Sequence, residues 1–265
     1  MPEKIKVAIV NYLNTKPFIQ GLSSGRIKPR TDLIECIPAD CARFYLEGKV
    51  DLSLVPVGAL VDALSIDRIS DFGIASDGPV ASVCILSDVP IESVKAIYLD
   101  YQSRTSVLLT KVLLQNYWHL APVFLNSDEG YETKIMGEVA GLVIGDRALE
   151  FKSNHAYVYD LGEIWKAYTG LPFVYAIWLK THRISPEYLD LFNLALQEGV
   201  DEIGNLLLHY PVEQRAMLTT YFNQNIRYRL NTAFDQGLSR FIQEVRGLND
   251  QQSHHADKIR VIADQ

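Results

Sequence analysis

The sequence is poor in cysteine, lacks long apolar runs and has no excess of basic residues. Only three of its 265 residues are cysteines (Cys36, Cys41 and Cys84), and no two are spaced as Cys-x-x-Cys. We therefore expect buried free thiols in a reducing compartment rather than a disulfide framework. No apolar run reaches the roughly 18 residues that cross a bilayer, and the N-terminal segment lacks the apolar region of a signal peptide. These absences predict a cytoplasmic protein with no membrane partner.

Charge and motifs exclude further classes of protein. The chain carries 25 basic and 32 acidic residues, a net charge of −7, which argues against nucleic-acid binding but not against a small anionic ligand. It contains no G-x-x-x-x-G-K-[ST], G-x-G-x-x-G or His-Glu-x-x-His sequence, and its six histidines are scattered. We therefore predict no metal and no cofactor, and the sequence predicts no oligomeric state.

The chain has instead a regular alternation of strand and helix patterns, followed by a helical segment. Apolar and β-branched runs predict strands at 5–10, 33–38, 50–55, 80–86, 95–99, 122–125, 140–144, 156–161 and 173–179. Helical periodicity alone continues to residue 247, and the polar residues after 248 are expected to be partly disordered. This alternation predicts parallel α/β sheets. We expect one lobe from residues 1–88 plus 173–265, with the C-terminal helices packed on it, a second lobe from 89–172, and a cleft between them.

Four consecutive polar residues, Ser103-Arg104-Thr105-Ser106, open the helix predicted at 103–118. A helix start has backbone N–H groups without partners and the positive end of the helix dipole, so it suits a carboxylate or phosphate. The alternative is an ordinary capped surface helix, because Ser and Thr are favoured at N-caps everywhere.

Other polar residues are expected at strand ends or at the junction of the lobes. Asn14 lies in the turn Asn11-Tyr12-Leu13-Asn14-Thr15 after the first strand, and Asp146 follows the strand at 140–144. Ser82 is a single hydroxyl in an apolar strand. Capping roles for Asn14 and Asp146, and a buried backbone partner for Ser82, are the alternatives to ligand contacts. Open α/β sheets bind ligands at strand ends, so these residues predict one cleft.

Several segments, taken together and in order from about residue 5 to 180, resemble the chorismate dehydratase family. They are Val10-Asn-Tyr-Leu-Asn-Thr-Lys-Pro-Phe18, Gly48-Lys-Val-Asp-Leu-Ser-Leu-Val-Pro56, Gly73-Ile-Ala-Ser-Asp-Gly-Pro-Val-Ala-Ser-Val83, Ser103-Arg-Thr-Ser-Val107, Ile144-Gly-Asp-Arg-Ala-Leu149 and Asp160-Leu-Gly-Glu-Ile-Trp165 with Thr169-Gly-Leu-Pro-Phe173. One departure is Pro56-Val57-Gly58, where the family often has serine.

The resemblance implies a two-lobed fold similar to type II periplasmic binding proteins, with the ligand between the lobes. It implies a hydro-lyase that dehydrates chorismate to 3-[(1-carboxyvinyl)oxy]benzoate on the futalosine route to menaquinone, with no metal or organic cofactor. Carried over by motif, Asn14 and Ser82 would lie at the reacting ring, and Ser103, Arg104, Thr105 and Ser106 would form the anion-binding helix start, while Asp146 remains a candidate ligand contact.

Our hypothesis is that Asn14 and Ser82 orient the ring and the leaving hydroxyl while a carboxylate of the substrate acts as the base. Two alternatives stay open. The sister enzyme of the pathway, 1,4-dihydroxy-6-naphthoate synthase, would be expected to use a histidine, and none is predicted at a strand end. A non-catalytic small-anion-binding protein would be expected to carry an export signal or a lipoprotein cysteine near its N-terminus.

Overall fold

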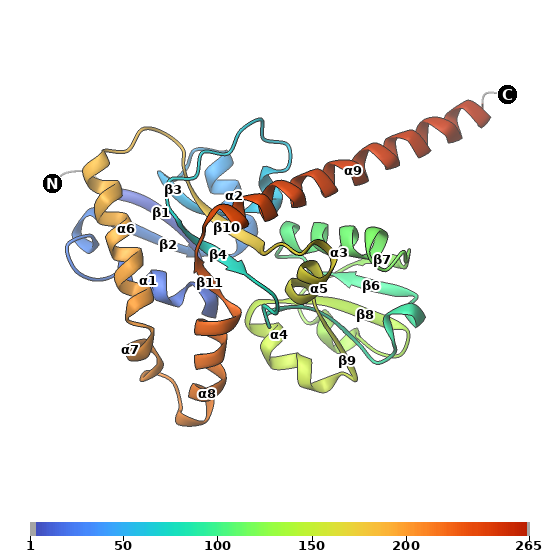
Figure 1. Ribbon diagram of the computed structural model, residues 1–265, viewed down its shortest axis with the longest axis horizontal. Helices are drawn as coiled ribbons and strands as arrows, with labels where there is room; N and C mark the ends of the chain where they lie inside the picture. Colours follow the sequence, from blue (N-terminus) through green and yellow to red (C-terminus); the bar gives the residue numbers. More distant parts are fainter. Residues whose placement is uncertain (1–3, 264–265) are drawn as a thin grey trace.

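In the computed structural model, which describes residues 4–263 and their side chains as far as residue 248, the strands form two separate sheets (Figure 1). The first sheet has the order β11-β4-β10-β3-β1-β2, and the second has the order β7-β6-β8-β5-β9. The strands of the first sheet are β1 (Ile5–Val10), β2 (Thr31–Cys36), β3 (Leu52–Pro56), β4 (Phe72–Ser76), β10 (Phe173–Lys180) and β11 (Arg227–Arg229). Those of the second are β5 (Val83–Ser87), β6 (Ala96–Leu99), β7 (Val123–Asn126), β8 (Val139–Ile144) and β9 (Tyr157–Asp160).

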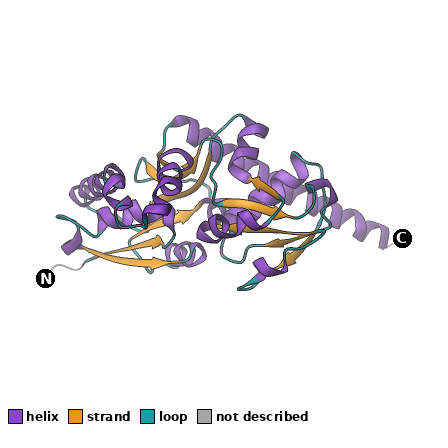
Figure 2. Ribbon diagram, turned by 90° about the horizontal axis from the view of Figure 1, so that it is seen from below, coloured by secondary structure: helices purple, strands orange, loops and turns teal. Residues whose placement is uncertain are grey.

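Helices lie along the strands in both halves of the molecule (Figure 2). In sequence order they are α1 (Lys16–Leu22), α2 (Pro38–Leu46), α3 (Arg104–Asn116), α4 (Gly145–Phe151) and α5 (Leu161–Thr169), followed by four in the C-terminal third. Local chemistry sets their ends. Pro38 begins α2, where its missing N–H costs nothing, and Asp160 caps α5 by accepting from the N–H groups of Gly162 and Glu163. Gly170 ends α5 with a φ of +71°, a conformation that favours glycine.

Both sheets are mixed rather than wholly parallel. β1 pairs in parallel with β2 and β3, and β6 pairs in parallel with β7 and β8. The strands that carry the chain between the sheets run the other way: β10 is antiparallel to β3 and β4, and β5 is antiparallel to β8 and β9. The expectation of parallel pairing therefore holds for the βα repeats and is wrong for the returning strands.

The predicted lobe boundary at residue 88 is also wrong, because β5 belongs to the second sheet. Val83 is in register with Ile144 of β8, and Cys84 is in register with Asp160 of β9. The chain leaves the first sheet after β4 and crosses at residues 77–82, then returns at residues 171–172. A continuous apolar run identifies a buried strand but not its partners, so the sequence pattern did not assign this strand to a sheet.

The C-terminal helices pack on the first sheet as expected, and one of them also reaches the second. They are α6 (Pro186–Asp201), α7 (Ile203–Leu207), α8 (Val212–Thr220) and α9 (Thr232–Ala263). α1 and α6 approach so closely that a Cβ on Gly199 would lie 2.0 Å from the carbonyl oxygen of Pro17. Glu244 of α9 accepts hydrogen bonds from Asn116 of α3 at 2.6 Å and Tyr168 of α5 at 3.1 Å. α9 therefore bridges the two halves (Figure 1).

The C-terminal third differs from the prediction in two respects. The short strand β11 and a π-helical turn, Tyr221–Asn225, interrupt a segment that the sequence predicts as helix only. The segment after residue 248 continues α9 as far as Ala263, and residues 264–265 lie outside the described part. Within residues 4–263 no helix combines the length and apolarity needed to cross a membrane. The cytoplasmic location stays a prediction.

Candidate functional site

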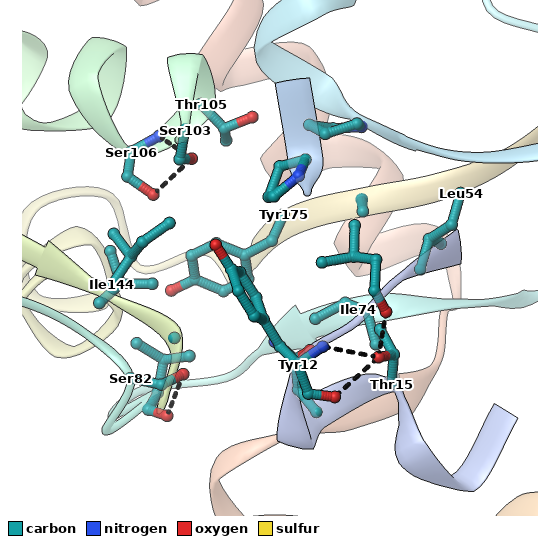
Figure 3. A pocket seen from close by; sticks show the side chains of 18 residues that line it. Tyr12, Thr15, Leu54, Ile74, Ser82, Ser103, Thr105, Ser106, Ile144 and Tyr175 are labelled. Carbon is teal, nitrogen blue, oxygen red and sulfur yellow. Dashed lines mark hydrogen bonds between the residues drawn. The ribbon is translucent and has the colours of Figure 1, made fainter. Parts of the chain in front are cut away.

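A cavity lies between the two sheets (Figure 3). Eighteen residues line it, from both sheets, and none of them has a charged side chain. Its polar groups belong to Tyr12, Asn14, Thr15, Ser82, Ser103, Thr105, Ser106 and Tyr175. Five of the seven predicted site residues are in that set, so the structure brings them together at one place.

Asn14 reaches the cavity from the turn that follows β1. Thr15 holds this turn: its hydroxyl donates to the carbonyl oxygens of Val10 and Tyr12 and accepts from the N–H of Tyr12 at 3.3 Å. The Oδ1 atom of Asn14 is buried and has no hydrogen-bond partner in the described part of the chain. An unsatisfied buried oxygen costs about 1–3 kcal/mol, and such an atom at a cavity is a candidate contact for a ligand donor.

Ser82 lies where the chain enters the second sheet, at the end of the 77–82 crossover. Its side chain is buried, and its hydroxyl lies 2.9 Å from the hydroxyl of Tyr221 and 3.5 Å from the carbonyl oxygen of Val80. The carbonyl oxygen of Ser82 accepts from the N–H of Gly145 at 2.8 Å. The buried backbone partner expected as the alternative is thus present, and the hydroxyl has in addition a shorter contact to a side chain.

The start of α3 contributes the hydroxyls of the opposite wall. Ser103 is the N-cap and accepts from the N–H of Ser106 at 3.2 Å, while the two serine hydroxyls lie 3.0 Å apart. The Oγ1 atom of Thr105 accepts from the N–H of Gly58 in the first half of the molecule at 2.9 Å. The cap expected as the alternative is thus present, and the same residues line the cavity.

Two predicted ligand residues do not line the cavity. Arg104 is exposed and pairs with Asp62 at 3.5 Å, because successive helical positions turn by about 100° and its neighbours Ser103 and Thr105 face inward. Asp146 accepts from the N–H of Leu13 at 3.0 Å, so it joins α4 to the turn after β1. In this structure Asp146 neither lines the cavity nor caps α4, and its hydrogen bond to Leu13 links the two halves instead.

Three aromatic residues and one glycine complete the site, and sequence reasoning did not single them out. Tyr12 lines the cavity and its hydroxyl bonds to Gln102, while Gly145, at a φ of +62°, leaves room for the Tyr12 ring: a Cβ there would be 3.2 Å from it. Tyr175 lines the centre, and Tyr221 contacts Ser82 from behind. Tyr12 stands in the turn already noted, but no local pattern marks the other two tyrosines.

The cavity is electrically neutral at physiological pH. Burial, reinforced by the charge of Asp100, raises the pKa of Tyr12, and burial likewise raises the pKa of Tyr175. Both phenols therefore stay protonated. No histidine, aspartate, glutamate or lysine is among the lining residues, and within the described residues no three His, Cys, Asp or Glu side chains gather as a metal site.

A charged cluster lies just behind the α3 wall. Asp100, whose side chain is fully buried, pairs with Arg147 at 2.6 Å and accepts from the N–H of Gln102 at 2.8 Å. Arg147 also pairs with the buried Glu132 and lies over the rings of Tyr101 and Tyr131. Burial raises the pKa of Asp100, and the charge of Arg147 opposes this. The cluster fixes the loop between β6 and α3, and so the position of Ser103.

The chain is similar to known proteins of menaquinone biosynthesis. Residues 5–246 match the model of a protein family described as menaquinone biosynthesis. A chorismate dehydratase of Thermus thermophilus is 28% identical over 233 residues, which cover 79% of this chain and 84% of that protein.

Solved structures show the fold. Protein AF1704 of Archaeoglobus fulgidus superposes with a TM-score of 0.69 at 16% identity, covering 93% of this chain and 98% of that one. The ligand-binding component of an ABC-type import system of Staphylococcus aureus has a TM-score of 0.64 at 11% identity, covering 93% and 92%. The fold is therefore the two-lobed α/β fold of periplasmic binding proteins, and by the match over residues 5–246 this chain belongs to the menaquinone biosynthesis family.

Proposed function

We propose that this protein is a chorismate dehydratase, a carbon–oxygen lyase that converts chorismate to 3-[(1-carboxyvinyl)oxy]benzoate and water on the futalosine route to menaquinone. The family match and the Thermus relative support this function. The observation that carries it is the composition of the cavity: hydroxyls at a helix start on one side, an unpartnered amide oxygen and a serine hydroxyl near it, and no charged side chain.

The hydroxyls at the start of α3 suit the carboxylates of chorismate. Ser103, Thr105 and Ser106 face the cavity at the positive end of a 13-residue helix. Helix starts bind anions through their N–H groups and dipole, and hydrogen bonds to a charged group are roughly twice as strong as neutral ones. We propose that one substrate carboxylate binds here, without a lysine or arginine in contact with it.

Asn14 and Ser82 suit the leaving hydroxyl. In the proposed reaction the C3 proton and the C4 hydroxyl leave chorismate, and the ring becomes aromatic. The Asn14 Oδ1 atom would accept from the C4 hydroxyl, and Ser82 would donate to the same oxygen as the C–O bond breaks and water forms. Groups aimed at the charge that develops in the transition state are commonly the largest catalytic contribution.

The base is best supplied by the substrate. The cavity lining contains no histidine or carboxylate, and its phenols have raised pKa values. We propose that the carboxylate of the enolpyruvyl group takes the C3 proton and then gives it to the departing C4 oxygen, so that water leaves and the carboxylate is restored. Positioning of the reacting groups can then contribute several kcal/mol, up to about 7–11 in the best cases. The alternative function, 1,4-dihydroxy-6-naphthoate synthase, would be expected to use a histidine, and no histidine lines this cavity.

One assay tests the proposal. The purified protein is incubated with chorismate, and loss of the diene absorbance is followed together with formation of the aromatic enol ether. We expect turnover, and a kcat lower by about 100-fold or more in the matched S82A protein. Chorismate binding that raises the melting temperature without turnover would instead support a small-anion-binding protein. If the protein neither binds chorismate nor turns it over, both the dehydratase and the small-anion-binding function are overturned.

A further inference from the structure

Tyr221 is a buried residue of the C-terminal third that contacts the cavity only through Ser82. It is 1% exposed and begins the π-helical turn Tyr221–Asn225, and its hydroxyl donates to the Oγ atom of Ser82 at 2.9 Å. Asn225 of the same turn donates to the carbonyl oxygen of Pro79 at 3.0 Å. This turn therefore holds the 77–82 crossover at two points. π-helical turns occur frequently at functional sites.

The backbone of Ser82 is fixed independently of Tyr221. The carboxylate of Asp160 accepts from the N–H groups of Val80 at 3.0 Å and Ala81 at 2.6 Å, and Gly145 donates to the carbonyl oxygen of Ser82. Ala81 has a φ of +65°, which is unfavourable for a residue with a side chain and persists only where its surroundings impose it. With the backbone held, the free variable at Ser82 is the direction of its O–H bond.

The hydroxyl of Tyr221 restricts the direction of the Ser82 O–H bond. A serine hydroxyl has one donor and two acceptor sites, and Tyr221 occupies an acceptor site. The hydrogen of Ser82 is then left to donate, either weakly to the carbonyl oxygen of Val80 at 3.5 Å or into the cavity that Ser82 lines. Complete burial raises the pKa of Tyr221, so this donor keeps its proton throughout the neutral and mildly alkaline range.

We propose that Tyr221 is a positioning residue for the dehydration, orienting the hydroxyl of Ser82 so that it donates to the departing oxygen of the substrate. This inference rests on the proposed function and adds to it a residue that acts through Ser82 without touching the substrate. It also gives the C-terminal helical segment a part in the chemistry, because α8 carries the turn that begins at Tyr221.

The test compares Y221F, S82A and the double variant, with Y228F as the control. Tyr228 is a buried tyrosine on β11 whose hydroxyl has no partner in the described part of the chain, so its removal costs no hydrogen bond. We expect Y221F to lower kcat by about tenfold, the worth of one oriented hydrogen bond, with KM within twofold of wild type. Y228F should keep wild-type kcat, and the melting temperatures of the two should agree within a few degrees.

The double variant separates positioning from general structural support. With Ser82 absent, loss of the Tyr221 hydroxyl should have no further effect on kcat, whereas independent effects would multiply. Wild-type kcat in Y221F, or multiplying effects, would overturn this inference while leaving the proposed function intact. An S82A variant with normal turnover would remove the role of Ser82 and that of Tyr221 with it. A wild-type protein that does not dehydrate chorismate would overturn the proposed function itself.

Discussion

The two walls of the cavity satisfy their polar groups in different ways. On the first-sheet wall, the Oδ1 atom of Asn14 is buried without a partner. On the α3 wall, Ser103 and Ser106 bond to each other, and Thr105 accepts from Gly58. A buried oxygen without a partner raises the free energy of the protein, and a ligand donor removes that cost. A hydroxyl that already has hydrogen bonds can bind a ligand only in addition to its existing partners. We propose that the first wall suits one specific donor of the ligand, and that the α3 wall suits an anion that adds to an existing network.

The largest effect is expected where a polar group acts on the leaving hydroxyl. N14A and S82A should each lower kcat by about 100-fold or more, because a donor or acceptor aimed at the transition state is worth that much. Steady-state kinetics with chorismate measure it. S87A is the control for Ser82, since Ser87 is a buried serine at the far end of the adjoining strand β5, and its hydroxyl bonds to Val89. N11A is the control for Asn14, since Asn11 is exposed. Near-normal turnover in both site variants would contradict the assignment.

The next largest fall in activity is expected when a side chain is added at Gly58, where the two halves are in close contact. A Cβ on Gly58 would lie 2.7 Å from the backbone N and Cα atoms of Thr105, so G58A must push α3 away from the first half. Misplacement of about 1 Å can cost up to about 100-fold, and we expect kcat/KM to fall by about 10- to 100-fold.

The control for this change is G204A in α7, where a Cβ would meet nothing within 4 Å. Chorismate should raise the melting temperature of the G204A protein as much as that of wild type, and raise that of G58A less. Equal shifts in the two variants would mean that contact between the halves at Gly58 does not matter for binding.

The fold could be predicted largely from the sequence because its elements are local. β1 has the bounds that its apolar run indicates, α3 begins after Ser103, and α5 ends before Gly170, as the sequence indicates. Pairing between strands is not local. The membership of β5 in the second sheet depends on Ile144 and Asp160, more than 50 residues away, and β11 has only three residues, too few for a pattern.

The site divides in the same way. Asn14, Ser82 and the hydroxyls of α3 stand in motifs, so the sequence could indicate them. Tyr221 could not be found, because its importance arises from a contact to a residue 139 positions away. Arg104 shows the converse: residue type and proximity in sequence suggest an anion ligand, but in this structure the side chain pairs with Asp62 and does not line the cavity.

A comparison of Ser106 with Arg104 tests that correction directly. S106A should raise KM for chorismate about tenfold, because a hydrogen bond to a carboxylate is worth about 1.5–3 kcal/mol. R104A should change KM less than twofold at physiological salt, because Arg104 is an exposed member of a surface ion pair. The reverse order, with Arg104 dominant and sensitive to salt, would show that the arginine binds the substrate after all and that the halves rearrange on binding.

The smallest effect on kcat is expected from a change of pH. A kcat that does not depend on pH would support a base supplied by the substrate. The only titratable side chains in the lining are phenols whose pKa is raised by burial, so they remain neutral well into the alkaline range. A substrate carboxylate with an ordinary pKa of about 3.5 is ionised throughout the neutral range. The plot of kcat against pH should therefore be flat from about pH 5.5 to 9, in wild type and in Y228F alike.

An ascending limb between about pH 6 and 7 would indicate a base such as a histidine. Because none lies in the lining, that result would require a conformation in which one of the histidines moves into the cavity, and it would exclude a base supplied by the substrate.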